Sequence, residues 1–317
     1  MISLLVTGAT TPMGERLVRS FIADARVGHV LAIGHEPPER ALPFSHSSRL
    51  QYLQVDLRSS RRVRELLFGP AKALGVEVVV HLSQHRSAHD HGSSVYRLNV
   101  ESTRSILDLA DRHPTIRRIV LRSFADVYKI TLELPTLVTE DHPLNLGSSA
   151  PQFIRDRVEA DLTACARMGL SDAEIVVLRT AEALAPGTGS QLYHFLDSPF
   201  CLRPAGFDPM VNVSTIADLV DAVEKATHGS GEGVFNVPGH DTLPLSECVR
   251  KWGTPCVPMP GTMIRPAYRA WHMASGSGFR YGLNRKRMHY GLVLDGTRAK
   301  TVLGYVPNNP VDWPRGV

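Results

Sequence analysis

The sequence predicts an α/β fold, in which a doubly wound parallel sheet is followed by a smaller C-terminal lobe. Short apolar runs, typical of parallel strands buried on both faces, alternate with helical patterns in the first half of the chain. A glycine-bearing turn joins the first of these runs to the first helix. From about Arg179 onward, proline and glycine divide shorter apolar segments, as in RPAGFDP and VPMPGTM. We therefore expect a sheet domain over residues 1–178 and a lobe built mainly by residues 179–317, with segments that return to the first domain.

The stretch LLVTGATTPMGER carries the first unit of this fold. A buried strand is expected at residues 2–6, a turn at residues 7–14, and a helix from Glu15 onward. Backbone N–H groups at the start of a helix are unpaired and carry a partial positive charge, so a pyrophosphate can bind there without a dedicated cation. Nucleotide binding is therefore the first functional hypothesis.

The turn departs from a Gly-x-x-Gly-x-x-Gly pattern at its middle position. Gly8 and Gly14 are present, but Thr11 stands where the middle glycine would let a ligand approach the backbone closely. Thr10 and Thr11 could instead cap the helix, with Pro12 in its first turn, where a missing N–H costs nothing. The stretch fits either a phosphate site or a well-capped strand-to-helix turn.

The second strand, expected at residues 30–33, ends without the usual acidic residue. A dinucleotide fold normally offers Asp or Glu there to the ribose hydroxyls. Gly34 and His35 occupy that end and Glu36 follows, so the acidic anchor for NAD is missing or displaced. A small residue with His35 and Arg40 nearby could accommodate a 2′-phosphate, which slightly favours NADP, whereas the alternative is a polar surface loop.

The alternation of strand and helix continues along the chain. Further strands are expected at residues 52–55, 76–82 and 116–121. A basic helix separates the first two of them, and a helix that begins at Asn99 precedes the third. This alternation predicts a parallel sheet covered by helices on both faces.

Short sequence matches follow one another in a fixed order along nearly the whole chain. They are Thr7-Gly8-Ala9-Thr10 with Gly14, Asp56-Leu57, His81-Leu82-Ser83, Asn99-Val100, Ser123 with Val127-Tyr128, Val177-Leu178-Arg179 with Pro186-Gly187, residues 211–219, Phe235-Asn236-Val237 and Leu303-Gly304-Tyr305-Val306-Pro307. In order and spacing they resemble the extended short-chain dehydrogenases/reductases, also called the NAD-dependent epimerase/dehydratase family. The resemblance implies a Rossmann-like first domain that binds NAD or NADP.

The resemblance also implies cofactor roles by position. It places Gly8, Thr10, Thr11, Pro12, Met13 and Gly14 around the pyrophosphate, Asp56 and Leu57 at the adenine, and Leu82, Ser83 and Gln84 beside the nicotinamide ribose. His35, Asn99 and Arg157 complete the expected cofactor-binding set. Without the resemblance, Asp56 would be interpreted as a helix cap and Leu82 as a core residue.

Family members use a Tyr-x-x-x-Lys pair on a helix for proton transfer. Residues four apart share a helix face, so the Lys ammonium can lower the Tyr pKa and let the phenol exchange a proton with the substrate. The corresponding helix here has Phe153 at the Tyr position and Arg157 at the Lys position. A phenyl ring has no proton to transfer, so this position cannot supply acid–base catalysis. Arg157 keeps a positive charge and could still hold the ribose through its planar fork.

The family also places a Ser or Thr hydroxyl four residues before the tyrosine of its Val-Tyr pair. Counting back from Tyr128 reaches Phe124. Ser123 stands one position early, where its side chain points to the opposite face of the strand unless the strand bulges. All three usual catalytic groups are therefore absent, and the catalytic residues are unknown. Tyr128, His85 or a group from the second lobe could compensate.

Three histidines, His85, His89 and His91, lie in the loop after the fourth strand, at the edge where ligands bind in this fold. Imidazoles could act there as acid or base, or the loop could simply be solvated. We assign no metal site, because no fourth ligand is apparent.

Composition narrows the range of partners and locations. Thirty-five Lys and Arg against 31 Asp and Glu give a net charge of +4, which is too weak to argue for nucleic acid. No apolar run approaches the roughly 20 residues needed to span a bilayer, so we expect a cytoplasmic protein without a membrane partner.

The four cysteines show no C-x-x-C pair and are interpreted as ordinary thiols. A homodimer through helices beside residues 153–165 is implied by the resemblance alone.

In the C-terminal lobe, an amphipathic helix is expected at residues 265–273, and residues 308–317 are expected to be a poorly tied terminus. The resemblance would point the basic residues of this lobe toward an anionic group such as a nucleotide-sugar diphosphate; a solvated positive surface is the alternative. These residues are Arg280, Arg285, Lys286 and Arg287.

Two functions remain open. The first is an NAD(P)-binding, epimerase/dehydratase-like protein that lacks the usual acid–base residues and acts as a binding, sensing or scaffold module. The second is an active epimerase, dehydratase or reductase that uses a non-standard acid or base on a nucleotide sugar or a similar anionic substrate. Both predict a nucleotide site at the first turn, although the departures there also leave open that no cofactor binds.

Overall fold

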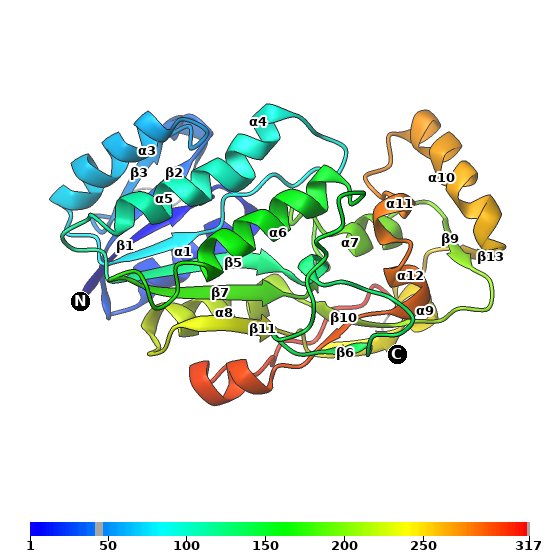
Figure 1. Cartoon of the computed structure of the whole chain (residues 1–317). Coiled ribbons are helices and arrows are strands. Elements are labelled where there is room, and N and C mark those ends of the chain that lie inside the picture. The colour runs from blue at the N-terminus through cyan, green and yellow to red at the C-terminus, as the bar shows by residue number, and fades with distance from the viewer. Residues whose placement is uncertain (42–46, 316–317) are drawn as a thin grey trace.

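A parallel sheet of seven strands forms the centre of the computed structural model, which describes residues 1–41 and 47–315 (Figure 1). The strands are β1 Ile2–Thr7, β2 Val27–Gly34, β3 Leu50–Gln54, β4 Val78–His81, β5 Arg118–Phe124, β7 Glu174–Thr180 and β11 Gly233–Val237. They lie in the order β11-β7-β5-β4-β1-β2-β3, and neighbouring strands are parallel. The strand order reverses between β1 and β4, where a doubly wound sheet leaves a crevice at its carboxyl edge. The predicted fold class is confirmed.

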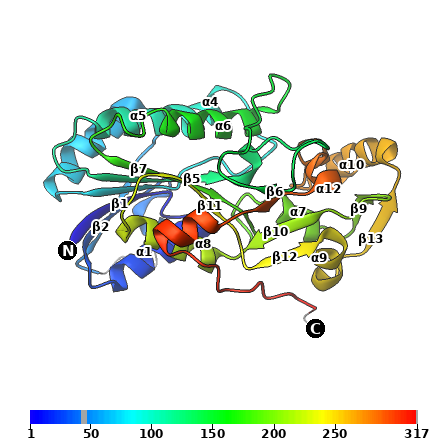
Figure 2. The ribbon, with the colours of Figure 1, turned by 60° about the horizontal axis from the view of Figure 1, so that its bottom comes forward.

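Helices cover both faces of the sheet, as Figure 2 shows. The helices α1 Pro12–Ala23 and α8 Ile216–His228 pack on one face, and α3 Ser60–Leu66, α5 Ser102–Ala110 and α6 Gln152–Cys165 pack on the other. Successive residues of a strand point to opposite faces. In β1, Leu4 and Val6 therefore belong to the apolar core beneath α1 and α8, and Leu5 belongs to the core beneath α3 and α5.

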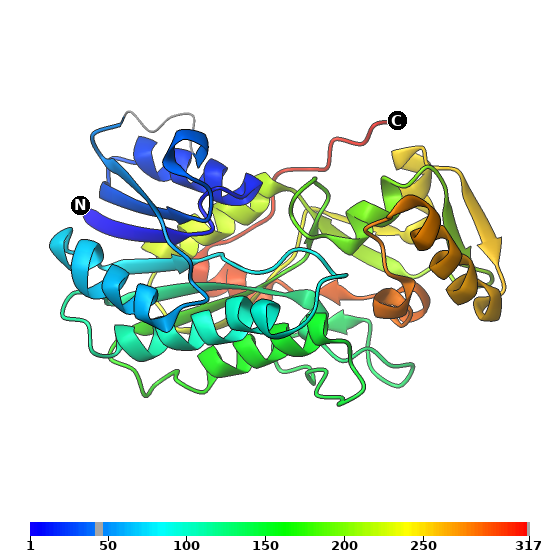
Figure 3. The same cartoon turned by 90° about the horizontal axis from the view of Figure 1, so that it is seen from above.

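The second lobe lies at the end toward which the strands of the sheet point (Figures 1 and 3). Its small sheets join β8 Glu182–Ala183, β10 Met210–Ser214 and β12 Asp241–Pro244; β9 Cys201–Pro204 and β13 Cys256–Met259; and β6 Leu137–Val138 and β14 Val293–Leu294. Its helices are α7 Gln191–Leu196, α9 Leu245–Trp252, α10 Gly261–Ser275, α11 Tyr281–Asn284 and α12 Arg287–Tyr290. Short helical segments elsewhere are α2 Pro38–Ala41, α4 Ser93–Tyr96, Leu67–Ala71, Arg97–Glu101, Ala125–Val127 and Ala299–Leu303. Because β7 continues almost directly into β8, the lobe is held against the carboxyl edge of the sheet.

The first helix begins at Pro12, three residues before the predicted start at Glu15. The Thr11 side chain caps this helix by accepting the Gly14 N–H at 3.0 Å. The prediction of a capped helix with proline in its first turn is confirmed, and the predicted boundary was three residues too late.

The C-terminal segment is tied to α8 on the sheet and to β12 in the lobe, contrary to the prediction. The N–H groups of Asn308 and Asn309 donate to Asp218 Oδ1 at 3.1 and 3.0 Å, and the Val311 N–H donates to Asp241 Oδ2 at 2.7 Å. Residues 316–317 lie outside the described part of the chain. The helix expected at residues 265–273 lies within α10.

Candidate functional site

A groove runs along the carboxyl edge of the sheet, above the ends of β1, β2, β3 and β4. Its largest cavity, about 320 Å³, is lined by the glycine turn, the ends of β2 and β3 and the loop after β4. We call this part the outer end of the groove. Among the residues predicted from sequence to bind a cofactor, it brings together Gly8, Thr10, Thr11, His35, Asp56, Leu57, Ser83 and Gln84.

The glycine turn keeps a tight shape although Thr11 replaces the middle glycine. Gly8 has a φ of +70°, which favours glycine, and a Cβ added at Gly14 would lie 2.1 Å from the Gly8 carbonyl oxygen. Thr11 Oγ1 donates to that oxygen at 2.8 Å and accepts from the Gly14 N–H. The turn therefore combines the predicted helix cap with the close strand-to-helix approach that a phosphate site needs.

Glu36 provides an acid at the end of β2, two residues beyond Gly34. Its carboxylate lines the groove and accepts hydrogen bonds from the Thr10 hydroxyl and from the His35 N–H. Burial acts to raise the pKa of Glu36, but the hydrogen bonds from Thr10 and from nearby backbone N–H groups outweigh it, so the pKa is lowered. A Cβ at Gly34 would lie 2.5 Å from Tyr52 Oη, so glycine is needed for this packing. The acidic residue that a dinucleotide fold normally has at the end of the second strand is thus displaced two residues along the chain, to Glu36.

Two cations were expected from sequence to hold a 2′-phosphate near this point. His35 lines the outer end of the groove. The side chain of Arg40 lies outside the described part of the structure.

Arg58, which the sequence analysis did not single out, holds Asp56 at the end of β3. Its Nε and Nη2 donate to the two Asp56 carboxylate oxygens at 2.8 and 2.9 Å, and this pairing lowers the pKa of Asp56. Arg58 Nη1 also donates to Ser94 Oγ at 3.0 Å. Arg58 therefore links the end of β3 to α4, through an ion pair on one side and a hydrogen bond on the other, and fixes the wall of the groove beside Leu57.

Hydrogen bonds to the Thr7 and Asn99 side chains hold the backbone of the loop after β4. Thr7 Oγ1 accepts from the N–H groups of Leu82 and Ser83 at 3.2 and 3.3 Å, and Asn99 Oδ1 accepts from the His85 N–H at 2.7 Å. Asn99 is buried and shapes the loop backbone. A direct contact of Asn99 with a cofactor stays a prediction.

At its inner end, above β4 and β5, the groove narrows to a cavity of about 10 Å³, which we call the inner cavity. Met13, Leu82, Gln84 and Arg157 line it. Of the predicted cofactor residues, these four and Thr11 meet here.

Arg157 lies between the rings of Phe124 and Phe153 at the inner end. Its guanidinium carbon is 3.6 Å from the centroid of the Phe124 ring and 3.8 Å from that of the Phe153 ring. Its Nη1 forms an ion pair with the Asp126 carboxylate. Burial lowers the pKa of Arg157, and Asp126 opposes that shift. We call these four residues the Arg157 cluster, in which a cation is stabilised by two aromatic faces and one carboxylate.

Comparison with known proteins agrees with this arrangement of turn and groove. Residues 4–195 match the model of the NAD dependent epimerase/dehydratase family. The chain belongs to this family. An uncharacterized protein of Mycobacterium tuberculosis is 26% identical, over 96% of this chain and 80% of that protein.

Solved structures of similar fold include two sugar-nucleotide enzymes. A dTDP-glucose 4,6-dehydratase from Bacillus anthracis in complex with NAD has a TM-score of 0.71 at 15% identity, over 99% of this chain and 94% of that one. A UDP-glucuronic acid 4-epimerase from Bacillus cereus in complex with UDP-glucuronic acid and NAD has a TM-score of 0.71 at 16% identity, over 98% of this chain and 95% of that one. At these identities the likeness shows the fold.

In this member of the epimerase/dehydratase family, Ser123 and Tyr128 belong to a separate buried network. Ser123 Oγ donates to Asp161 at 2.5 Å, and Arg179 pairs with Asp161 at 2.6 Å and donates to Tyr128 Oη at 3.1 Å. Burial raises the pKa of Tyr128 to about 12, and its hydroxyl donates to Asn236. Tyr128 is therefore unsuited to replace the missing acid or base near neutral pH.

Arg122 on β5 is a site residue that the sequence analysis missed. It is 8% exposed and lines the inner cavity with Gln84 and Arg157. Its guanidinium carbon lies 4.6 Å from the Phe124 ring centroid. Burial and, next, the charge of Arg157 lower the pKa of Arg122 to about 9, so it stays cationic at neutral pH. An arginine within an apolar strand, two residues before Phe124 and thus on the same face, was the available signal.

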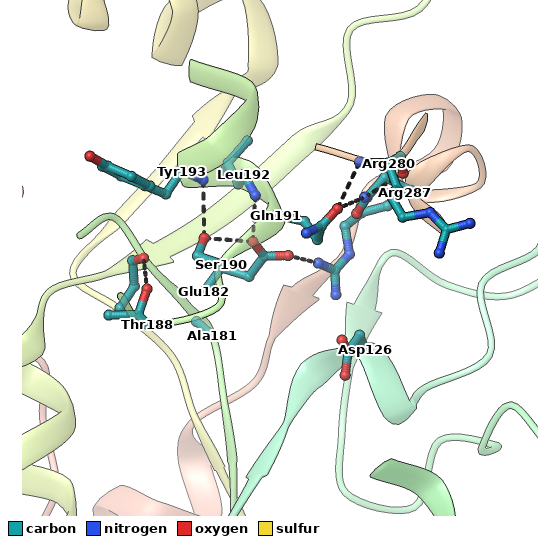
Figure 4. A network of polar contacts seen from close by, with 12 residues as sticks. Asp126, Ala181, Glu182, Thr188, Ser190, Gln191, Leu192, Tyr193, Arg280 and Arg287 are labelled. Carbon is teal, nitrogen blue, oxygen red and sulfur yellow. Dashed lines mark hydrogen bonds and ion pairs between the residues drawn. The ribbon is translucent and has the colours of Figure 1, made fainter. Parts of the chain in front are cut away.

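On the lobe side of the Arg157 cluster, Glu182 organises a second polar network (Figure 4). One carboxylate oxygen accepts from Ser190 Oγ at 2.7 Å and from the Leu192 N–H at 2.6 Å, and the other pairs with Arg287. Arg287, which the resemblance would point toward an anionic substrate, is thus partnered within the chain. Arg280 donates to the Ala88 carbonyl.

The three histidines after β4 do not converge. His85 Nε2 lies 2.7 Å from Asp90 Oδ2 and the side chain borders both parts of the groove. His89 stacks on His272 with ring centroids 4.0 Å apart, and His91 is exposed. Within residues 1–41 and 47–315, no group of three His, Cys, Asp or Glu side chains is placed to hold a metal ion. None of the helices in the described part of the chain is long and apolar enough to cross a membrane.

Proposed function

We propose that this chain binds NAD in the groove and does not perform the acid–base step usual for its family, so that it acts as a binding or sensing module. The Arg157 cluster is the observation that supports this proposal. General acid–base catalysis needs a side chain that can exchange a proton near the reacting atoms. Phe124 and Phe153 have no such proton, and Arg157 between them stays charged at neutral pH.

The outer end of the groove supports NAD over NADP. Ribose hydroxyls can donate hydrogen bonds to the Glu36 carboxylate, whereas a 2′-phosphate would meet a like charge there. This preference reverses the slight preference for NADP drawn from the sequence, in which the acidic anchor is missing or displaced. The solved dehydratase and epimerase of similar fold are both complexes with NAD.

Thermal unfolding with each dinucleotide tests the binding proposal. A ligand that binds only the folded state raises the midpoint, so NADH at about 1 mM should raise it, and NADPH should raise it less. No shift with NAD⁺, NADH, NADP⁺ or NADPH would overturn the proposal.

Product formation tests the absence of the usual chemistry. With dTDP-glucose or UDP-glucuronic acid, the substrates suggested by proteins of similar fold, the wild type should form no new sugar nucleotide detectable by NMR, a readout chosen because dehydration and epimerisation leave no net reduced nicotinamide. A triple variant, Phe124→Ser with Phe153→Tyr and Arg157→Lys, restores the missing groups and is the matched control. Turnover by the wild type would contradict the non-catalytic proposal.

A second candidate function is an enzyme that uses His85 as its acid or base. His85 borders both parts of the groove, and the Asp90 carboxylate 2.7 Å away can orient its ring. If the wild type shows turnover, His85→Gln should abolish it, and His91→Gln in the same loop should leave it unchanged. Turnover that survives His85→Gln would exclude this candidate.

A further inference from the structure

Cys201 and Cys256, far apart in the sequence, face each other in the second lobe. They are paired residues of the parallel ladder between β9 and β13, where the Cys201 N–H donates to the Pro255 carbonyl at 2.9 Å. Paired residues of neighbouring strands have their side chains on the same face, with Cα atoms about 4.8 Å apart. A disulfide usually joins Cα atoms about 4.4–6.8 Å apart. The backbone therefore places these two cysteines where one bond can join them.

The two side chains are already in contact. The Cys201 thiol donates a hydrogen bond to the Cys256 sulfur, and both cysteines are free thiols. Helix α10 packs beside the two strands (Figure 1), and its Tyr268 hydroxyl accepts from the Leu202 N–H at 2.8 Å. This packing holds β9, and with it the thiol pair, in a fixed place.

The two thiols differ in access to solvent and in acidity. Cys201 is 0% exposed, whereas Cys256 is half-buried. The hydrogen bond from Cys201 lowers the pKa of Cys256, burial opposes this shift, and the charge of Arg203 adds to it. Arg203 follows Cys201 by two residues on β9, so it lies on the same face of the ladder. Because the thiolate is the reactive form, Cys256 is the sulfur that a small oxidant should attack first.

The other two cysteines have a different setting. Cys165 lies on α6 against the large sheet, and Cys248 is buried on α9. Burial raises the pKa of both thiols to about 12, so both stay protonated at neutral pH. A protonated thiol is a poor nucleophile, so both should react slowly and can serve as internal controls.

We propose that Cys201 and Cys256 form an oxidation site, at which a peroxide oxidises Cys256 and Cys201 then closes a reversible disulfide. The Cys256 thiolate attacks one peroxide oxygen: an S–O bond forms, the O–O bond breaks, and the departing hydroxide takes up the proton that the thiol has lost. The Cys201 sulfur then attacks the sulfenic acid: an S–S bond forms, the S–O bond breaks, and the hydroxide leaves as water with the Cys201 proton. The two sulfurs together lose two electrons, which reduce one hydrogen peroxide to two waters. A dithiol reverses the reaction by thiol–disulfide exchange.

Non-reducing peptide mapping by mass spectrometry tests the proposal on the folded full chain after treatment with hydrogen peroxide. The wild type should give one linked pair of peptides, joined through Cys201 and Cys256, and dithiothreitol should separate them. In Cys201→Ser, the sulfenic acid on Cys256 should persist and react with dimedone. In Cys256→Ser, no linked pair should form. Cys165→Ser is the matched control and should form the same link as the wild type.

Thermal unfolding provides a second readout. A disulfide that closes a long loop restricts the unfolded chain, so peroxide should raise the midpoint of the wild type and of Cys165→Ser. Dithiothreitol should return both midpoints to their starting values. Peroxide should not raise the midpoint of Cys201→Ser or of Cys256→Ser, because neither variant can form the bond.

Each other outcome contradicts a stated part of the proposal. Oxidation of Cys256 to a sulfinic acid without a link to Cys201, or no oxidation of Cys256, overturns the site. Oxidation of Cys165 or Cys248 as fast as that of Cys256 overturns its selectivity. A link that dithiothreitol does not remove overturns its reversibility. If Cys201→Ser does not fold, Cys201→Ala provides the same comparison with a small apolar side chain.

Discussion

The two ends of the groove differ in what they keep of the family pattern. The outer end has a cavity of about 320 Å³, the glycine turn and an acidic side chain at the end of β2. The inner end has a cavity of about 10 Å³ and a guanidinium held between Phe124 and Phe153. The departures predicted from the sequence thus concentrate at the inner end, where we expect proton transfer to occur in the family. Binding and chemistry depend on different elements of this fold, the first on the ends of β1 to β3 and the second on β5 and α6, so one can change while the other is retained.

Removing the Arg157 guanidinium should lower the free energy of unfolding more than any other change predicted here, because it breaks the buried ion pair at the inner end of the groove. In Arg157→Met, the Asp126 carboxylate would stay buried without its counter-charge, since the two side chains are only 6% and 14% exposed. Breaking a buried ion pair on one side typically costs about 3–5 kcal/mol. We expect a loss of this size in the free energy of unfolding, measured by urea denaturation.

Arg155→Met is the matched control on the same helix. Arg155 is exposed, so its replacement should change the free energy of unfolding by less than about 0.5 kcal/mol. Adding Asp126→Asn to Arg157→Met should recover part of the lost stability, because it removes the uncompensated charge. Equal losses in Arg157→Met and Arg155→Met would show that the cluster does not stabilise the inner end.

The sequence predicts the elements of both ends but not how their side chains meet. The strands and the turn follow from local apolar patterns and from Gly8 and Gly14, which respond to short-range geometry. The sequence does not show that Glu36 lines the groove, because its contact with Thr10 depends on how Gly34 and Tyr52 pack across two strands. Such packing is not encoded in spacing along the chain.

At the inner end, the resemblance in sequence predicts that Phe124, Phe153 and Arg157 stand where the family has its proton-transfer groups. Their assembly around one guanidinium could not be predicted, because β5 and α6 are brought together only by the tertiary fold. Arg122 was missed for the same reason: an arginine in a strand has no assigned role until its neighbours across the sheet are known. The predicted position of Ser123 on the opposite face required only the alternation of a regular strand.

His81, at the end of β4 between the two ends of the groove, should make stability depend on pH. Its Nδ1 lies 2.8 Å from Thr7 Oγ1 and its Nε2 lies 3.1 Å from Thr103 Oγ1. Burial lowers the pKa of His81 from 6.5 to about 4. Between these values the unfolded chain binds the proton and the folded chain does not. Stability should therefore fall as the pH decreases from 6.5 to about 4, by up to about 1.4 kcal/mol per pH unit.

Urea denaturation at a series of pH values measures this dependence, and His81→Gln should remove the part due to His81. His29→Gln, at an exposed histidine on β2, is the control and should keep the wild-type slope. Identical slopes in the wild type and His81→Gln across this window would mean that His81 does not keep its neutral form in the folded protein.

The smallest expected effect concerns cofactor choice at the outer end. Glu36→Gln removes the negative charge that a 2′-phosphate would meet, so the affinity for NADPH relative to NADH should rise about tenfold, or about 1.4 kcal/mol. Calorimetry with the two reduced dinucleotides measures this ratio. Because both carry the same uncharged ring, the inner end contributes equally and the change isolates the outer end. Glu39→Gln, at an exposed carboxylate in α2, should leave the ratio unchanged. If Glu36→Gln also leaves it unchanged, Glu36 is not the acid that binds the ribose, and the contrast between the two ends rests on the glycine turn alone.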